Sequence, residues 1–403
     1  MPDLETLRIG RRHTSGKECL PACLTLGALI KRIQAEPNPN ERFAFLMPRT
    51  QGPCRLGVYN LLDQITLERL NWKHRVRIWS PAESGYFDAT PPGWAMLVFA
   101  GFMASDLLQA ALMEIRPDET DPGAAQSIYS RYMRDLSELL ESEARKELSL
   151  AASIWQTASG HLFGLRRLLL RAVAELKSIR GCVPRPTVLV AGEIYVRCDP
   201  FANDSIVKKL EARGLRCRLA PLTEWLEYVE YLNTRLPQAR LSKRLGKWLQ
   251  DRVQQLMYST MAQSLGWPRK MSIQQSLAAA APYIREALAG EAVLTVGGAL
   301  HEWRHGHIDA VLSIGPLECL PNKVAEAQFF HGAEQEGLLS LTISVNGDPV
   351  DPEIIDNFAF EVHARHRKKH PDYRVPPLFS GRMQSTPPDM PDVKTGSQRL
   401  LRA

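Results

Sequence analysis

Three of the seven cysteines lie in loops that contain glycine or proline, each shortly before a predicted helix. Cys19 stands in TSGKECLP, Cys54 stands in TQGPCRLG after a predicted strand, and Cys319 stands in GPLECLP after another. Glycine and proline let the backbone approach a bulky group and keep the thiolate outside regular structure. Soft thiolate ligands favour an iron–sulfur cluster, zinc or copper(I) over hard cations. Three thiolates on one cubane cluster would leave one iron open for exchange or for substrate.

The other four cysteines are weaker candidates, because a lone cysteine commonly acts as a small buried hydrophobic residue. Cys182 precedes a predicted strand, Cys217 begins one and Cys198 lies just past one. Cys23 is four residues after Cys19, so it is a candidate accessory residue of the same site.

Polar residues follow the strand predicted over 187–196. Glu193 and Arg197 lie near its end, and Asn203 precedes the next predicted helix. Such groups bind anions or order a ligand loop, so all three are candidate accessory residues. The simpler interpretation of Asn203 is a helix N-cap. The glycine turn at 295–298 lacks the full dinucleotide fingerprint, so NAD binding is not predicted.

The segment HEWRH offers a competing metal site. Two histidines one helical turn apart, His301 and His305, match the zinc ligands of metallopeptidases, with Glu302 as the group that activates water. That chemistry needs a long helix, whereas the glycines at 297–298 and 306 predict only about two turns of surface helix. We therefore interpret HEWRH as a chance match.

Length and charge limit the class of protein. A chain of 403 residues with 44% hydrophobic residues can bury a large core and is long enough for two or three domains. The net charge is only +6, and the single dense basic run, HARHRKKH at 363–370, is interpreted as a solvated helix end. No basic motif interleaved with aromatic residues accompanies this run, so nucleic-acid binding is not predicted.

The chain is expected to be cytoplasmic. Its first residues lack the basic start and apolar run of a signal peptide. The longest apolar stretch runs from Trp94 to Met103 with Gly101 inside it, well short of the roughly 20 residues that cross a bilayer. Seven cysteines are too sparse for a secreted disulfide scaffold and stay available as thiols in a reducing compartment.

The elements that must position these residues alternate between strands and helices. We expect an N-terminal α/β lobe over 1–122, a helical connector over 123–184, a C-terminal α/β lobe over 185–370 and a disordered proline-rich tail over 371–403. Repeated alternation predicts parallel sheets with ligand loops at the carboxyl ends of the strands. The expected strands are 42–47, 75–79, 187–196, 216–220, 292–296, 310–314 and 338–345. The expected helices are 24–34, 59–70, 104–114, 205–213, 241–265, 273–288 and one that begins near 324.

Five long stretches in the same order carry a family resemblance that covers about Leu7 to Val362. They are TSGKECLP (14–21), MPRTQGPCRLGVY (47–59), GEIYVRCDPFANDSIVKKLEARG (192–214), LAPLTEW (219–225) and GPLECLP (315–321). The sequence resembles the D-component of 2-hydroxyglutaryl-CoA dehydratase and its relatives, a domain also found in CoA-substrate-specific enzyme activases and double-cubane cluster proteins.

The resemblance implies two Rossmann-like lobes joined by a helical segment, with a cluster in the cleft between them. It carries the ligand role onto Cys19, Cys54 and Cys319. It also implies low-potential electron transfer from a partner ATPase, an activase with its own iron–sulfur cluster, for reductive or radical acyl-CoA dehydratase chemistry. This chain lacks the glycine-rich phosphate-binding segment of the activases, so another chain must hydrolyse ATP.

Several alternatives stay open at this point. The cluster is either a single [4Fe-4S] cubane, which three cysteines suit, or a double cubane, which would need more ligands. A dehydratase would also need an acyl-CoA pocket and a second subunit or a homodimer. The chain could instead be a non-catalytic scaffold or regulatory subunit of such a system, because one fold hosts many functions.

Overall fold

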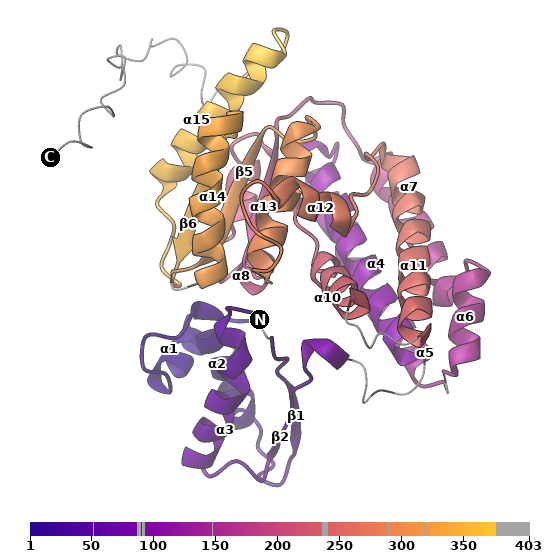
Figure 1. Cartoon of the computed structure of the whole chain (residues 1–403), viewed down its shortest axis with the longest axis vertical. Helices are drawn as coiled ribbons and strands as arrows, with labels where there is room; N and C mark the ends of the chain where they lie inside the picture. Colours follow the sequence, from indigo (N-terminus) through magenta and orange to yellow (C-terminus); the bar gives the residue numbers. More distant parts are fainter. Residues whose placement is uncertain are drawn as a thin grey trace, which may run out of the picture.

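The computed structural model describes residues 1–50, 52–86, 90, 93–146, 148–235, 241–288, 290–317 and 319–375. Figure 1 shows a small N-terminal lobe in indigo beneath a sheet-containing C-terminal lobe in orange and yellow, with a bundle of helices beside them. Most of the predicted tail, residues 376–403, lies outside the described residues. The general α/β class expected from the sequence is confirmed, with two parallel sheets and many helices.

The N-terminal lobe contains a two-stranded parallel sheet covered by helices. Gly10 and Gly27 lie where the first two helices cross, and a side chain at either position would overlap the backbone of the other helix. Glycine therefore permits this close helix contact. The elements are α1 (Leu4–Arg12), α2 (Leu20–Gln34), β1 (Phe43–Leu46), the 3₁₀ helix η1 (Arg55–Val58), α3 (Tyr59–Arg69), β2 (Val76–Trp79) and η2 (Glu83–Gly85).

The helical bundle buries the most apolar helix of the chain. The segment Trp94–Asp118 is long and apolar enough to cross a membrane, but 61% of its most apolar window is buried inside the protein. Its side chains pack against those of the neighbouring helices, as in the core helix of a bundle. The bundle helices are α4 (Trp94–Ile115), α5 (Ala124–Ala144), α6 (Leu150–Ala158), α7 (Leu165–Ser178), α10 (Thr223–Arg235) and α11 (Leu241–Leu265), with the short η3 (Arg116–Asp118) and η4 (Leu162–Gly164).

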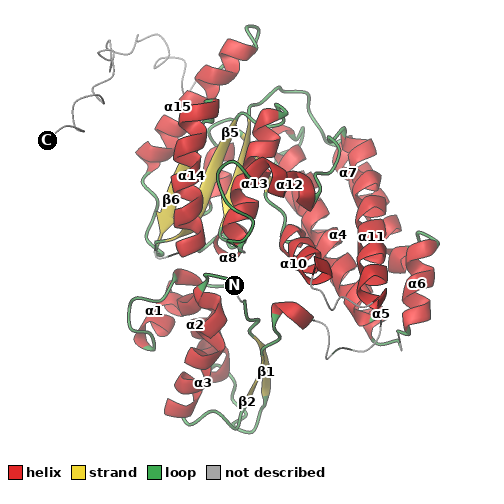
Figure 2. Ribbon diagram, in the orientation of Figure 1, coloured by secondary structure: helices red, strands yellow, loops and turns green. Residues whose placement is uncertain are grey.

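The C-terminal lobe is built on a four-stranded parallel sheet in the order β4-β3-β5-β6 (Figure 2). Alternate residues of β3 enter two cores: Val188 and Val190 face α9 and α15, while Leu189 and Ala191 face α12 and α13. The elements are β3 (Thr187–Gly192), α8 (Ile194–Cys198), α9 (Ile206–Glu211), β4 (Arg216–Leu219), α12 (Ile273–Ala280), α13 (Glu291–Arg304), β5 (Ala310–Pro316), α14 (Leu320–Glu336), β6 (Ser340–Val345) and α15 (Pro352–Lys369).

This strand order places the candidate loops together. The chain leaves β3 toward β4 and returns to β5 on the other side of β3, so the crossover direction reverses between β3 and β5. Ligands of open parallel sheets bind outside the carboxyl ends of the strands at such a point. Glu193 follows β3 directly, and Cys319 lies just after β5.

Three sequence predictions about elements are wrong. Residues 292–296 are not a strand but belong to the first turns of α13. Every residue of this apolar run is buried, so the hydrophobic periodicity cannot distinguish a helix from a strand. The strand expected to reach Val196 ends at Gly192, whose φ of 107° breaks the extended conformation before α8. The helix expected over 273–288 ends at Ala280, shortly before Pro282.

The basic run at 363–370 is only partly a solvated helix end. His363 is fully buried, and its ring stacks on Tyr373, whose hydroxyl lies 2.9 Å from His363 Nδ1. His366 Nδ1 lies 2.9 Å from Asp309 Oδ1. Val375 packs against the core of the C-terminal lobe. The first residues of the predicted tail, up to Val375, therefore contact the lobe.

Candidate functional site

The three cysteines of the glycine and proline loops line one cavity of about 550 Å³ between the N-terminal and C-terminal lobes. Each is the N-cap residue of a helix: Cys19 of α2, Cys54 of η1 before α3, and Cys319 of α14. Cys19 and Cys319 are buried, while Cys54 is exposed. Residues from two lobes and more than 250 positions apart in the chain thus reach a common space.

The local sequence explains why these helices begin at cysteine. Leu-Pro follows both Cys19 and Cys319, and proline fits the first helical turn because its missing N–H would have no partner there. No capping hydrogen bond joins the sulfur of any of the three cysteines to its first helical turn. The nearby backbone N–H groups of Ala22, Leu56 and Asn322 nevertheless act to lower the pKa of the respective thiols.

The electrostatics of the site favour neutral thiols. Burial raises the pKa of Cys19 and of Cys319, and for Cys19 the hydrogen bond with Tyr59 only partly offsets this effect. Because thiols lose their protons when they bind a metal, a bound metal would have to overcome this preference.

The donor groups of the site are not gathered around one point. Among the described residues, no three histidine, cysteine, aspartate or glutamate side chains are grouped closely enough to hold a metal ion. The thiols of Cys19, Cys54 and Cys319 line the cavity and are the type of donor that iron–sulfur clusters take.

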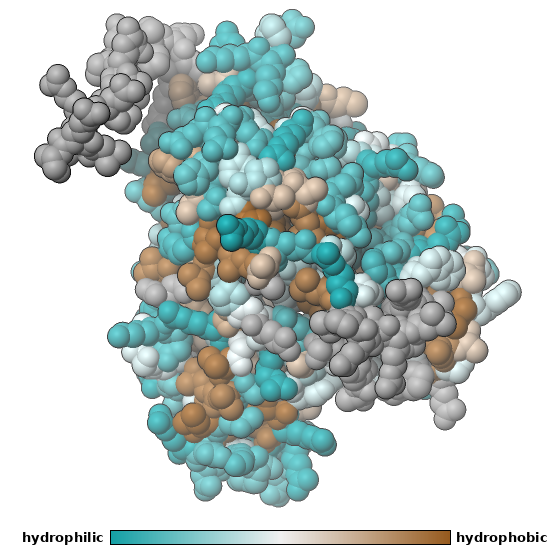
Figure 3. All heavy atoms as spheres, in the orientation of Figure 1, coloured by the Kyte–Doolittle hydropathy of each residue, from teal (hydrophilic) through white to brown (hydrophobic). Residues whose placement is uncertain are grey.

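The wall around the thiols is mostly apolar. On the face drawn in Figure 3, apolar side chains appear on both lobes near their boundary. Several large hydrophobic residues of the cavity remain exposed, which marks an open site rather than a closed core. They are Leu46, Trp79, Phe102 and Leu320.

Two of the four accessory candidates reach the site. Glu193 lines the cavity and caps α8 by accepting hydrogen bonds from the backbone N–H groups of Tyr195 (3.1 Å) and Val196 (2.8 Å). Arg197 is buried beneath it, where its guanidinium donates to the Gly192 carbonyl oxygen at 2.6 Å. Arg197 also donates to Glu291 Oε1 at 3.2 Å, so it ties this carboxylate of the cavity wall to the end of β3.

The other two accessory candidates lie elsewhere. Asn203 is buried and donates to the carbonyl oxygens of Val196 (2.9 Å) and Arg197 (3.1 Å), which joins α8 to α9. Its Oδ1 accepts from the Ile206 N–H at 3.3 Å, although Ser205 occupies the N-cap position of α9. Cys23 is buried in the core of the C-terminal lobe with its sulfur 3.6 Å from Thr14 Oγ1.

Sequence reasoning missed two residues of the cavity. Tyr59 is buried, and its hydroxyl hydrogen-bonds the Cys19 thiol. In the sequence, the only indication that Tyr59 belongs to the site was its position at the end of the stretch 47–59, five residues after Cys54. Glu291 was missed because α13 was expected to begin as a strand. Burial of this carboxyl raises its pKa to about 8, and the neighbouring Glu193 acts in the same direction.

The HEWRH segment belongs to a longer helix than expected. It lies in the last turns of α13, which spans 14 residues and runs through the glycine pair at 297–298. The rings of His301 and His305 are 4.1 Å apart, but Glu302 is engaged by Arg218 at 3.0 Å and by His307 at 3.3 Å. A carboxylate paired with Arg218 is poorly placed to activate a metal-bound water.

Purified protein is therefore expected to hold no stoichiometric zinc at HEWRH. The double substitution of His301 and His305 by alanine should leave the metal content of the protein unchanged, because no third ligand group adjoins these histidines among the described residues. Elemental analysis of the wild type and the variant tests this expectation. Zinc near one atom per chain that disappears in the variant would contradict it.

Comparisons with known proteins add no relative: no family model matches the sequence, and no curated protein or solved structure matches it.

Proposed function

We propose that this chain holds one iron–sulfur cluster on Cys19, Cys54 and Cys319 and accepts low-potential electrons from an ATP-hydrolysing activase with its own cluster. The observation that carries the proposal is the arrival of three helix N-termini, each capped by a cysteine, at one cavity. The proposal includes the family resemblance of the same loops. It also includes the presence of two Rossmann-like lobes around the cavity.

The residues of the chain then have distinct roles. The backbone N–H groups of the three first turns lie near the thiols, where they would stabilise negative charge on bound thiolates and so tune the reduction potential. The Tyr59 hydroxyl holds the Cys19 sulfur in place. Arg197 holds Glu291 on the wall, and the first turn of α8 holds Glu193 there, so that these carboxyls can exchange protons with a bound substrate.

The cavity has room for more than a cluster, and its wall is largely apolar. We infer that a substrate with an apolar body lies beside the cluster, as in dehydratase-type reduction of an acyl-CoA. A bound cluster would supply one-electron transfer and an open iron position for such chemistry. The proposed setting is the cytoplasm, with a second subunit or a second copy of the chain completing the substrate site.

Anaerobic reconstitution tests the proposal. Protein incubated with ferrous iron and sulfide, then desalted, is expected to keep about four iron and four sulfide per chain with broad visible absorbance. An activase with ATP should then bleach that absorbance, whereas ATP alone should not. A cluster that the activase never reduces would favour the scaffold or regulatory subunit, and protein that keeps no iron would contradict the proposal.

A further inference from the structure

A second cavity, of about 170 Å³, lies between the helical bundle and the C-terminal lobe. It is formed by residues of α4, α10, α11 and α13 and by the segment 266–272 before α12. Its volume exceeds the roughly 150 Å³ of an engineered protein cavity that binds benzene. The cavity is therefore large enough for a small organic molecule.

Aromatic and sulfur-containing side chains form much of its wall. Tyr258 and Trp267 lie side by side with ring centroids 5.8 Å apart and planes tilted by 42°. Met103 and Met271 line the cavity as well, and methionine adapts its shape to irregular ligands. The body of a ligand in this cavity must therefore be apolar, and the exposed faces of the two rings would attract a cation.

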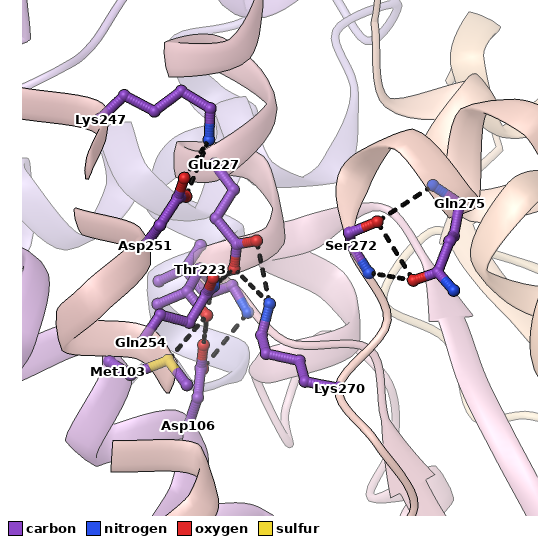
Figure 4. Close-up of polar contacts among 11 residues, drawn as sticks. Met103, Asp106, Thr223, Glu227, Lys247, Asp251, Gln254, Lys270, Ser272 and Gln275 are labelled. Carbon is purple, nitrogen blue, oxygen red and sulfur yellow. Dashed lines mark hydrogen bonds and ion pairs between the residues drawn. The ribbon is translucent and has the colours of Figure 1, made fainter. Parts of the chain in front are cut away.

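Most polar side chains of the wall already have partners within the protein. Figure 4 shows Asp106 accepting hydrogen bonds from the Thr223 backbone N–H (2.8 Å) and hydroxyl (2.7 Å). The same view shows Lys270 reaching both carboxylate oxygens of Glu227 at 2.9 Å. Glu302 pairs with Arg218 at 3.0 Å. These groups contribute structure and leave little capacity for a ligand.

Glu224 is different. Its Oε1 oxygen is buried on the cavity wall and has no hydrogen-bond partner among the described residues. Gly298 of α13 lies beside it, and a β-carbon at that position would be 3.5 Å from Glu224 Oε1. A buried oxygen without a partner is destabilising, and burial raises the pKa of this carboxyl to about 7. A hydrogen-bond donor in the cavity would relieve both effects.

We propose that this cavity binds a small protonated amine whose apolar body is about the size of a benzene ring. The ammonium donates to Glu224 Oε1 in the space beside Gly298, and the body lies against Tyr258 and Trp267. An anion would meet the unpaired carboxylate, so the site selects amines over carboxylates of the same shape. The site is separate from Cys19, Cys54 and Cys319, and the inference does not depend on the proposed cluster.

Three ring compounds of one shape test the inference: benzylamine, benzyl alcohol and benzoate. Each is titrated into the full-length protein without iron, with binding followed by calorimetry and by tryptophan fluorescence, which Trp267 should report. Benzylamine is expected to bind at least tenfold more tightly than benzyl alcohol, and benzoate is expected not to bind. Equal binding of the amine and the alcohol, tighter binding of benzoate, or no binding of benzylamine would overturn the inference.

Substitutions at Glu224 and Gly298 test whether the ammonium binds at the assigned position. Glu224→Gln should weaken benzylamine at least tenfold while leaving benzyl alcohol unchanged, and Glu286→Gln is a control because Glu286 pairs with Arg235 at the surface. If Glu224→Gln fails to fold, Gly298→Ala gives the same test, because its added methyl group would lie 3.5 Å from Glu224 Oε1, in the space assigned to the ammonium. The contact is of ordinary length, and alanine is accommodated in the helix α13. That variant should fold and weaken benzylamine severalfold. Unchanged benzylamine affinity in a folded variant would contradict the assigned position.

Discussion

Serine in place of Cys19, Cys54 or Cys319 is expected to lower bound iron after anaerobic reconstitution to less than half of the wild-type amount. A serine oxygen is a harder ligand than a thiolate and suits iron–sulfur clusters poorly. Each thiol begins a different helix at the same cavity, and among the described residues no fourth cysteine lines that cavity to replace a lost one. Iron and sulfide per chain, together with visible absorbance, measure the loss.

Cys217→Ser is the matched control for these variants. Cys217 is buried in the core of the C-terminal lobe and does not line the cavity between the lobes, so its substitution should leave iron content unchanged. Cys182→Ser adds an exposed control. Iron retained in all three cavity variants, or lost equally in Cys217→Ser, would refute the assignment of the ligands.

Gly192→Ala is expected to destabilise the fold by about 3–5 kcal/mol. Gly192 ends β3 with φ of 107°, a conformation that costs other residues roughly 1–3 kcal/mol. The new β-carbon would also overlap the Ile314 carbonyl oxygen of β5. The two central strands would then separate where Glu193 and Arg197 leave the sheet. Chemical denaturation of the two proteins measures the difference in free energy of unfolding.

Gly246→Ala is the opposite control in the same assay. Gly246 lies inside α11, and a β-carbon there would meet no atom within 4 Å. Alanine is favoured over glycine in a helix by about 1 kcal/mol, so this variant should be slightly more stable than the wild type. If Gly192→Ala were as stable as the wild type, the expected strain and overlap at the end of β3 would be contradicted.

The sequence indicated the cysteines of the cavity because their signals are local. A Gly or Pro loop, a preceding strand and a following helix can each be recognised within about ten residues, and all three loops became helix N-termini. The helix over 241–265 was predicted to the residue, because its apolar spacing is uninterrupted. Both strands of the N-terminal lobe were also expected in place.

The residues that complete the site depend on contacts distant in sequence. Glu291 faces the cavity only because α13 packs against β3, and its apolar start resembles a buried strand. Tyr59 reaches Cys19 across 40 positions, and the buried Glu224 Oε1 lies beside Gly298, 74 positions away in the chain. Asn203, by contrast, has the sequence of a site residue but serves the junction of α8 and α9.

Anomalous scattering at the iron absorption edge, from crystals of anaerobically reconstituted protein, tests the central claim most directly. The account predicts one strong peak in the cavity between the lobes, bordered by the sulfurs of Cys19, Cys54 and Cys319. Iron density at HEWRH or at another site, or no iron density in crystals of protein that carries iron in solution, would contradict it.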